Sequence, residues 1–302
     1  SQFPYGGWYQ WALKGVLENE GDPGAYQDAV SVVEGLNWIN PTFGSYRHDA
    51  DGNRESAPGW NYTFDGRNRL VEAETDGYPG NSNGTRLIFE YDSEGRRVEK
   101  EVTTKVSGVE TTLTTHFVWD GWDLLYECRE DQGGAILLER RYVWGADLSG
   151  SMGGAGGAGG LLAYQETKNG TSTVYFPLYD GVGNIVGLAD QAGTLLAEYR
   201  YGPFGELIEA TGPAAADNPW RFATKYEDLE TRLIYFGLRY FDPVTGNWLS
   251  REPLGEDESL NLYAYCHGDP VNKVDVLGAA EKDILHPNEA GRFKYENGHW
   301  LV

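Results

Sequence analysis

The chain has 302 residues, enough for one large domain or two ordinary ones, and its 40% hydrophobic composition can support a buried core. Its 46 acidic and 24 basic residues leave a formal charge of −22, which repels phosphate backbones and anionic membrane surfaces. We therefore expect no nucleic-acid partner. With no run of 18 apolar residues and no signal-peptide pattern in the opening SQFPYGGWYQ, we also expect no membrane insertion.

The distribution of aromatic residues and glycines favours strands. The chain contains 41 Gly, 20 Tyr and 10 Trp, but a single Met. Aromatic side chains are enriched in strands, and glycine permits tight turns. The composition therefore predicts many short hairpins and little helix.

Residues 1–40 form the first predicted segment and carry no repeat signature. A weak helical spacing of apolar residues occurs at residues 8–13 and 25–36. We assign this segment no fold and no role.

Residues 41–217 contain an internal repeat, which decides the architecture. In each copy an aromatic residue ends one strand, Asp accepts hydrogen bonds from the turn, and Gly supplies a positive φ. One hairpin cannot bury its apolar face alone, so the hairpins must pack side by side in a continuous sheet. The copies are Tyr62–Val71, Phe89–Val98, Phe117–Leu125 and Tyr179–Val186, with looser members at Tyr46–Asn53 and Tyr199–Leu207.

The glycine-rich stretch Ser151–Gly160 separates two strand-like runs. It lacks the Lys-Ser/Thr of a phosphate-binding loop. We expect a flexible or closely packed surface loop.

The repeats resemble the YD-repeat family, which includes Rhs proteins, the C subunits of insecticidal Tc toxins and the teneurin shells. The resemblance covers roughly residues 40–279 and is strongest from Asn218 onward, where NPWRFATKYEDLETRLIYFGLRYFDPVTGNWLS and the residues after it resemble the Rhs-associated core segment. It implies an all-β fold: antiparallel hairpins in a spiralling shell over 41–217, closed by the core segment 218–279 as an inward-turning plug. Residues 280–302 form a short tail.

The resemblance also implies a candidate site. In Tc-toxin C subunits and many Rhs proteins, the core segment is an aspartyl-type autoprotease that cuts the chain just after itself and releases the C-terminal cargo. The matching positions are Arg239 of RYFDP, Glu252 of SREP and Asp275 of DVLG, with the cut after Ala279. Glu252 replaces the family's Asp, Val276 replaces its Pro, and Ala279 replaces its Leu or Met.

The chemistry of such a site requires two carboxyls whose pKa values differ, with an arginine holding the ionised one. Glu252 is one methylene longer than Asp, and a misplacement of about 1 Å can cost roughly a hundredfold in rate. Two interpretations stay open: a self-cleaving site, or a buried polar network of Arg239, Glu252 and Asp275 that pins the end of the chain.

Other patterns have simpler interpretations. Asp49–Asn53 resembles half of a calcium loop, but its twelfth position is Trp60 rather than Glu, so we predict a turn. Cys128 and Cys266 fit no metal spacing and are predicted to be free buried thiols. The aromatic residues are expected to pack between hairpins rather than form a sugar-binding platform. We predict no cofactor and no metal.

The leading functional hypothesis is structural: the end of an Rhs-type shell that encapsulates or presents a C-terminal polypeptide in a polymorphic-toxin context. An active autoprotease and a cell-surface adhesin or glycan-binding shell are the alternatives. The expected partners are the remainder of the shell, its C-terminal cargo, or a surface protein or glycan. By resemblance we expect a secreted or cell-surface location. Complete shells in this family are much longer, so we expect this chain to be a fragment, a cleaved product, or a subunit that completes its shell with another chain.

Overall fold

The computed structural model describes residues 7–17, 29–39, 46–255, 260–279, 281–283, 294–296 and 299–301. It divides into two compact units, the first comprising Ser1–Arg47 and Ser56–Pro58. In that unit β1 (Gly7–Leu17) pairs antiparallel with β2 (Ala29–Ile39). The weak helical spacing noted in this segment is therefore misleading. The β-branched residues of β2, which reads AVSVVEGLNWI, favour an extended backbone.

The repeat region forms one antiparallel sheet in which each strand pairs with its neighbours in the chain, in the order β3 to β16. This confirms the prediction of hairpins laid side by side. The strands are β3 (Arg47–His48), β4 (Arg54–Ala57), β5 (Trp60–Phe64), β6 (Leu70–Thr75), β7 (Gly84–Tyr91), β8 (Arg97–Val106), β9 (Val109–Asp120), β10 (Asp123–Asp131), β11 (Ile136–Trp144), β12 (Leu161–Lys168), β13 (Thr171–Tyr179), β14 (Ile185–Ala189), β15 (Leu195–Tyr201) and β16 (Leu207–Thr211).

In the repeats that contain Asp65, Asp92 and Asp180, the aspartate organises the turn. Asp92 Oδ1 accepts hydrogen bonds from the backbone N–H groups of Glu94 and Arg96, both at 2.9 Å. Asp180 makes the same pair of bonds, two and four residues further on. After Asp65, Asp92 and Asp180 the residue with positive φ is the third after the aspartate, for example Gly95 at 88°. The glycine that directly follows Asp65 or Asp180 is therefore not the left-handed position that we predicted. After Asp120 the residue with positive φ is Gly121, at 55°, which directly follows the aspartate as predicted.

A row of hydrogen bonds that runs across the sheet at one end of its strands explains the aromatic residue of the repeat. A tyrosine hydroxyl or tryptophan indole N–H near the end of one strand donates to a backbone carbonyl near the start of the preceding strand, so each link joins two neighbouring strands. The links are Tyr91 to Leu70, Trp119 to Arg97, Trp144 to Leu124, Tyr179 to Leu161 and Tyr201 to Ile185. We call this set the aromatic ladder.

The aromatic ladder predicts a small, repeated stability loss. Tyr91→Phe and Tyr201→Phe each remove only the hydroxyl, so each is expected to lower the free energy of unfolding by about 1 kcal/mol. Urea unfolding followed by tryptophan fluorescence measures this. Unchanged midpoints in both variants would show that the ladder contributes nothing to stability.

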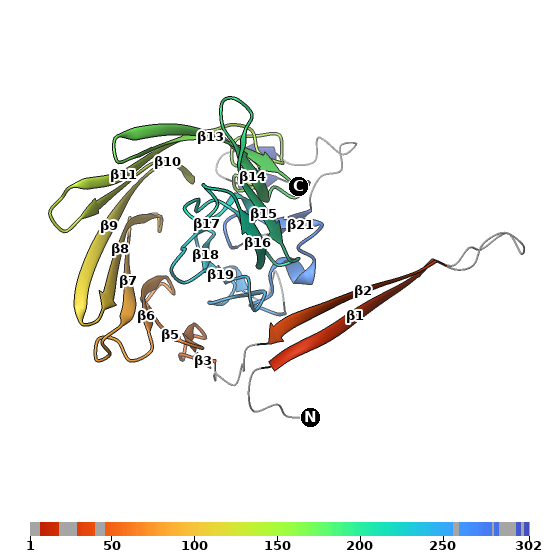
Figure 1. The fold of residues 1–302 in the computed structure, drawn as a ribbon, viewed down its shortest axis with the longest axis horizontal. Helices are drawn as coiled ribbons and strands as arrows, with labels where there is room; N and C mark the ends of the chain where they lie inside the picture. Colours follow the sequence, from red (N-terminus) through yellow and green to blue (C-terminus); the bar gives the residue numbers. More distant parts are fainter. Residues whose placement is uncertain are drawn as a thin grey trace, which may run out of the picture. The chain divides into compact units, whose positions relative to one another are not determined.

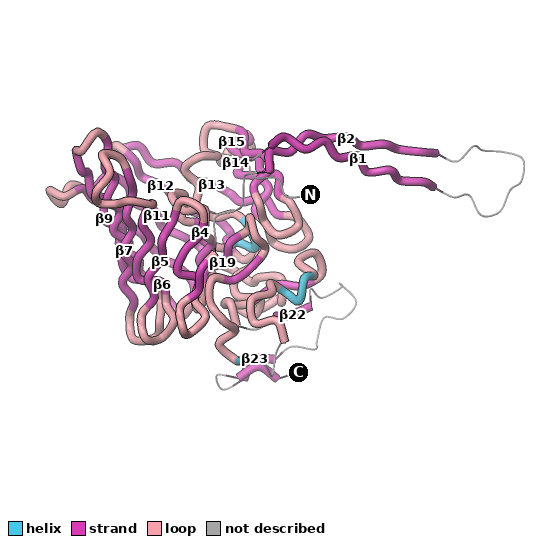
Figure 2. The backbone as a smooth tube through the Cα atoms, turned by 90° about the horizontal axis from the view of Figure 1, so that it is seen from below, coloured by secondary structure: helices cyan, strands magenta, loops and turns pink. Residues whose placement is uncertain are grey.

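The segment after β16 lies on the concave side of the curved sheet (Figure 1). It forms a four-stranded sheet in the order β17–β18–β19–β20, with short 3-10 turns before and after it. Apart from short 3-10 turns, which also include Gly255, the described chain is strand and loop (Figure 2). The elements are η1 (Phe222–Thr224), β17 (Tyr226–Glu227), β18 (Ile234–Tyr235), β19 (Tyr240–Asp242), β20 (Asn247–Trp248), η3 (Cys266–Gly268), β21 (Lys273–Asp275), β22 (Glu281–Asp283), β23 (Lys294–Glu296) and β24 (His299–Leu301).

Buried ion pairs fasten this closing segment, residues 218–279, to the sheet. Asp228, fully buried, binds Arg97 Nη1 at 2.7 Å and Lys100 Nζ at 2.9 Å, both cations on β8. The guanidinium of Arg97 also lies over the rings of Phe117 and Tyr235, at 4.8 Å from each centroid. Buried charges require such partners. The closing segment is thus held against the sheet by specific buried contacts.

Aromatic side chains fill the space between the sheet and the closing segment. Trp220 packs edge-to-face against Tyr142 and Trp144, at centroid distances of 5.5 and 5.2 Å. Of the aromatic side chains in residues 46–255 and 260–279, only those of Tyr46 and Phe176 are exposed. In these two ranges the aromatic side chains therefore pack against other parts of the chain, as expected, rather than form an external platform. Within the described ranges, no helix combines the length and apolar character that a transmembrane span requires.

One cysteine prediction needs correction. Neither cysteine forms a disulfide, and Cys266 is buried, but Cys128 is only half-buried. A register shift between Leu124 and Tyr126 on β10 turns Glu127 inward and leaves Cys128 toward the other face.

Candidate functional site

The three residues singled out in the sequence meet at the end of the closing segment. Arg239 directly precedes β19, Glu252 follows β20, and Asp275 ends β21. Arg239 Nη2 lies 2.5 Å from Glu252 Oε2 and 3.5 Å from Asp275 Oδ2. The predicted spacing thus corresponds to one cluster, in which two carboxyls share a single guanidinium nitrogen.

The same residues hold the backbone that follows β21. Asp275 Oδ1 accepts the N–H groups of Gly278 at 2.6 Å and Ala279 at 3.0 Å. Arg239 Nε donates to the carbonyl oxygen of Gly278. The backbone N–H of Leu238 donates to the carbonyl of Leu277 at 2.9 Å. The segment on the N-terminal side of the predicted cut is therefore fixed in place, while Ala280 lies outside the described residues.

Burial governs the protonation of this cluster. It raises the pKa of Asp275, and the positive charge of Arg239 opposes that rise. Burial likewise raises the pKa of Glu252; Arg239 opposes this rise, whereas the charge of Asp275 adds to it. Burial also lowers the pKa of Arg239 despite its two acidic partners. One of the two carboxyls can therefore keep a proton at a higher pH than an exposed carboxyl.

The two carboxyls differ in access to solvent. Glu252 lines an open depression of about 430 Å³, together with Arg239, Arg67, Asn68 and Arg251. The side chain of Asp275 is 5% exposed and lies deeper. A water molecule can reach Glu252 first, whereas Asp275 faces the backbone of residues 278–279. This division suits a pair in which one carboxyl acts on water and the other on a peptide group.

The aspartate inside the RYFDP motif does not join this cluster. Asp242 binds Arg54 Nη1 at 2.7 Å and accepts the N–H of Val244 at 3.0 Å within its own turn. The Asp49–Asn53 stretch is also a turn, with the N–H of Asn53 donating to Asp49 Oδ1 at 2.8 Å. Over residues 46–255 and 260–279, no group of three or more His, Cys, Asp or Glu residues could hold a metal ion.

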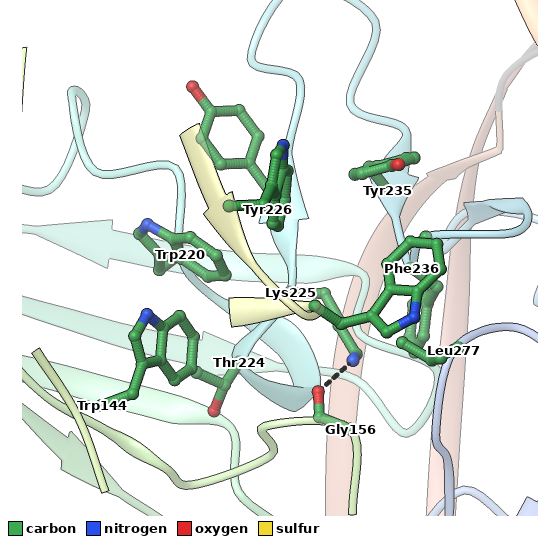
Figure 3. A pocket seen from close by; sticks show the side chains of 12 residues that line it. Trp144, Gly156, Trp220, Thr224, Lys225, Tyr226, Tyr235, Phe236 and Leu277 are labelled. Carbon is green, nitrogen blue, oxygen red and sulfur yellow. Dashed lines mark hydrogen bonds between the residues drawn. The ribbon is translucent and has the colours of Figure 1, made fainter. Parts of the chain in front are cut away.

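Two neighbours of the cluster were not predicted there from the sequence: Lys225 carried no signal, and the glycine-rich stretch was expected only as a loop. Lys225 donates to the carbonyl oxygen of Val276 at 2.9 Å and to that of Gly156 (Figure 3). The glycine-rich stretch is largely buried, and Asp147 Oδ2 accepts the N–H groups of Ala155 at 2.6 Å and Gly157 at 3.0 Å. Of the two expectations for this loop, close packing is the one observed.

Comparison with known proteins identifies relatives. Residues 157–271 match the family described as the teneurin YD-shell. The double-stranded DNA deaminase toxin A of Burkholderia cenocepacia is 32% identical over 239 residues, which cover 75% of this chain and 16% of that protein. The tRNA3(Ser)-specific nuclease WapA of Bacillus spizizenii is 29% identical over 255 residues, covering 82% of this chain and 10% of that protein.

A solved structure shares the fold. The crystal structure of TcdB2-TccC3-TEV aligns with a TM-score of 0.64 and 22% identity over 79% of this chain and 11% of that chain. Together with the hairpins, their Asp-led turns and the docked closing segment, this defines the class as a YD-repeat β-shell. The chain belongs to the YD-repeat family of Rhs type. It spans 10% and 16% of the two curated relatives, and the boundaries at residues 40, 217 and 279 stay predictions.

Proposed function

We propose that this chain is the closing end of a YD-repeat shell that encloses or presents a C-terminal polypeptide, in the context of a polymorphic toxin. The docking of residues 218–279 on the concave face of the sheet by the buried Asp228 ion pairs is the observation that carries the proposal. Its partners are the remainder of the shell and the polypeptide after the core segment. Its location is secreted or at the cell surface. The toxin and nuclease names of the relatives support this context.

Limited proteolysis of the full chain with a protease that requires an unfolded segment tests this role. We expect residues 218–279 and the sheet to become susceptible together, at the same urea concentration, because their ion pairs lie in one interior. Mass spectrometry of the fragments identifies the sites. Early removal of residues 218–279 from a sheet that stays resistant would contradict a closing role.

A second candidate function is self-cleavage after Ala279, favoured by the convergence of Glu252 and Asp275 on Arg239. A water oxygen adds to the carbonyl carbon of Ala279, and the bond to the nitrogen of Ala280 breaks. The water oxygen stays in the new carboxyl group, and the amine leaves with one proton more. We assign removal of the water proton to Glu252, which lines the depression, and delivery of a proton to the leaving nitrogen to Asp275.

Intact-mass measurement of the purified chain shows whether the site cleaves the chain or is inactive. If the site is active, the parent ends at Ala279 and Asp275→Asn stays whole, because an amide cannot exchange the proton. Glu252→Asp serves as the matched variant, since it restores the family's shorter acid and is expected to cleave at least as fast. A whole parent together with a whole Glu252→Asp variant would leave Arg239, Glu252 and Asp275 as a structural network.

A further inference from the structure

Lys225 is a buried cation that joins two distant parts of the chain. It lies between η1 and β17, and its residue is 5% exposed. Its Nζ donates to the carbonyls of Val276, at 2.9 Å, and Gly156, and it lies 5.4 Å from the ring centroid of Phe236 (Figure 3). Nothing in the cleavage chemistry assigned to Glu252 and Asp275 uses this residue.

With Lys225 included, three consecutive backbone carbonyls before the predicted cut are held. Lys225 binds that of Val276, the N–H of Leu238 binds that of Leu277, and Arg239 Nε binds that of Gly278. A backbone fixed at successive carbonyls cannot slide or rotate relative to the groups that hold it. Lys225 supplies the contact farthest from the cut.

The glycine-rich loop also contacts the Val276 peptide. Gly156 has a φ of 64°, and a Cβ atom there would lie 1.8 Å from the carbonyl oxygen of Val276. Its backbone therefore contacts the Val276 peptide more closely than any side chain would permit. The ammonium group of Lys225 therefore bridges the carbonyls of two peptides, Gly156 and Val276, that already lie in close contact.

The charges around Lys225 connect it to the carboxyl cluster. Burial lowers its pKa to about 8, and the negative charges of Asp275 on β21, Asp147 before the loop and Asp123 at the start of β10 oppose this shift. In return, the charge of Lys225 is one of the influences that lower the pKa of Asp275 against the effect of burial. Other neighbours of Lys225 in this small pocket are aromatic, among them Trp122 and Tyr235.

We propose that Lys225 is a positioning residue: together with Gly156 it clamps the Val276 peptide, orders residues 276–279 beside Arg239, Glu252 and Asp275, and places a positive charge next to Asp275. The clamp itself is independent of the chain's activity. Only the effect on the rate of cleavage rests on the proposed function.

The test uses the full chain and three variants. Lys225→Met removes donor and charge, Lys225→Gln keeps a donor without the charge, and Lys168→Met removes a half-exposed lysine that pairs with Asp217 elsewhere. Hydrogen–deuterium exchange of peptides covering residues 274–279 is the first readout. We expect exchange there to rise about tenfold or more in Lys225→Met, to rise less in Lys225→Gln, and to stay at the parent rate in Lys168→Met.

The pH profile of cleavage is the second readout. Both Lys225 variants lose the charge beside Asp275, so the limb of the profile that Asp275 governs is expected to move to higher pH in both, but not in Lys168→Met. A purely structural lysine would change the rate without moving the limb, and a limb that stays in place overturns the electrostatic part of the proposal.

Failure of the clamp and failure of the cleavage hypothesis are distinguishable. If the parent never cleaves, the self-cleavage candidate is wrong, and exchange at residues 274–279 still decides the clamp. Parent-like exchange there in both Lys225 variants overturns the clamp. A rise in exchange of equal size in β7 to β9 also counts against the clamp, because a clamp acts locally. If Lys225→Met unfolds, exchange at residues 274–279 is measured in the milder variant Lys225→Gln instead.

Discussion

Replacing Asp228 by alanine is expected to lower the free energy of unfolding by about 3–5 kcal/mol. The side chain is fully buried and is the shared partner of Arg97 and Lys100. Its removal leaves two buried cations on β8, with only Glu230 still paired to Lys100. A loss of this size is a large fraction of the stability of a typical domain. Urea unfolding followed by tryptophan fluorescence gives the number.

An exposed ion pair provides the matched control. Arg200 Nη2 lies 2.6 Å from Glu209 Oε2, with side chains 71% and 48% exposed. Glu209→Ala is expected to cost less than about 1 kcal/mol, because solvent screens the pair. If Asp228→Ala cost no more than Glu209→Ala, the closing segment would not depend on its buried ion pairs.

The same aspartate makes docking sensitive to acid. Burial alone would raise the pKa of Asp228, but Arg97 and Lys100 hold it below the ordinary value of 3.8. A carboxyl with a depressed pKa contributes stability that is present above its unfolded-state pKa and lost as the pH falls through the folded-state value. This contribution is therefore intact at neutral pH and disappears only below about pH 4.

Replacing Gly156 by alanine is expected to destabilise the chain by about 1–3 kcal/mol more than the same change at Gly95. Both glycines have positive φ, at 64° and 88°. A Cβ at Gly95 meets open space, whereas one at Gly156 would lie 1.8 Å from the carbonyl oxygen of Val276. The Gly95 variant therefore measures the cost of the left-handed backbone alone, about 1 kcal/mol.

Thermal unfolding of both variants under identical conditions makes this comparison. Equal losses of stability at the two positions would show that the loop does not contact the Val276 peptide as described. A greater loss for Gly156→Ala, with exchange rising at residues 274–279, would place the damage at this contact.

The repeat region was predictable from the sequence because its determinants are local. Asp92 and the residues two and four positions later form one turn, so a short window of sequence contains the whole interaction. The aromatic ladder extends only one strand back, and it gives a physical reason for the aromatic residue that the repeat pattern already displayed. By contrast, the strands β1 and β2 carry no such turn signature, and the weak periodicity of their apolar residues indicated a helix instead of a strand.

The candidate site was only partly predictable. Family resemblance selected Arg239, Glu252 and Asp275, which the fold brings together from positions 13 and 36 residues apart. Resemblance gave no reason to select Lys225, whose partners lie 69 residues before it and 51 residues after it. Its role arises from the packing of the glycine-rich loop on the chain end, and no local pattern encodes that contact.

The aromatic ladder also bears on how shells of this kind vary in length. Each link reaches only the neighbouring strand, so duplication or deletion of one complete hairpin in the gene leaves every other link with its partner. Insertion of a single residue within a strand instead reverses the faces of the side chains beyond it and displaces the donor from its acceptor. Evolution can therefore lengthen or shorten the wall in units of one hairpin, while the fit between the closing segment and its own strands limits change at this end.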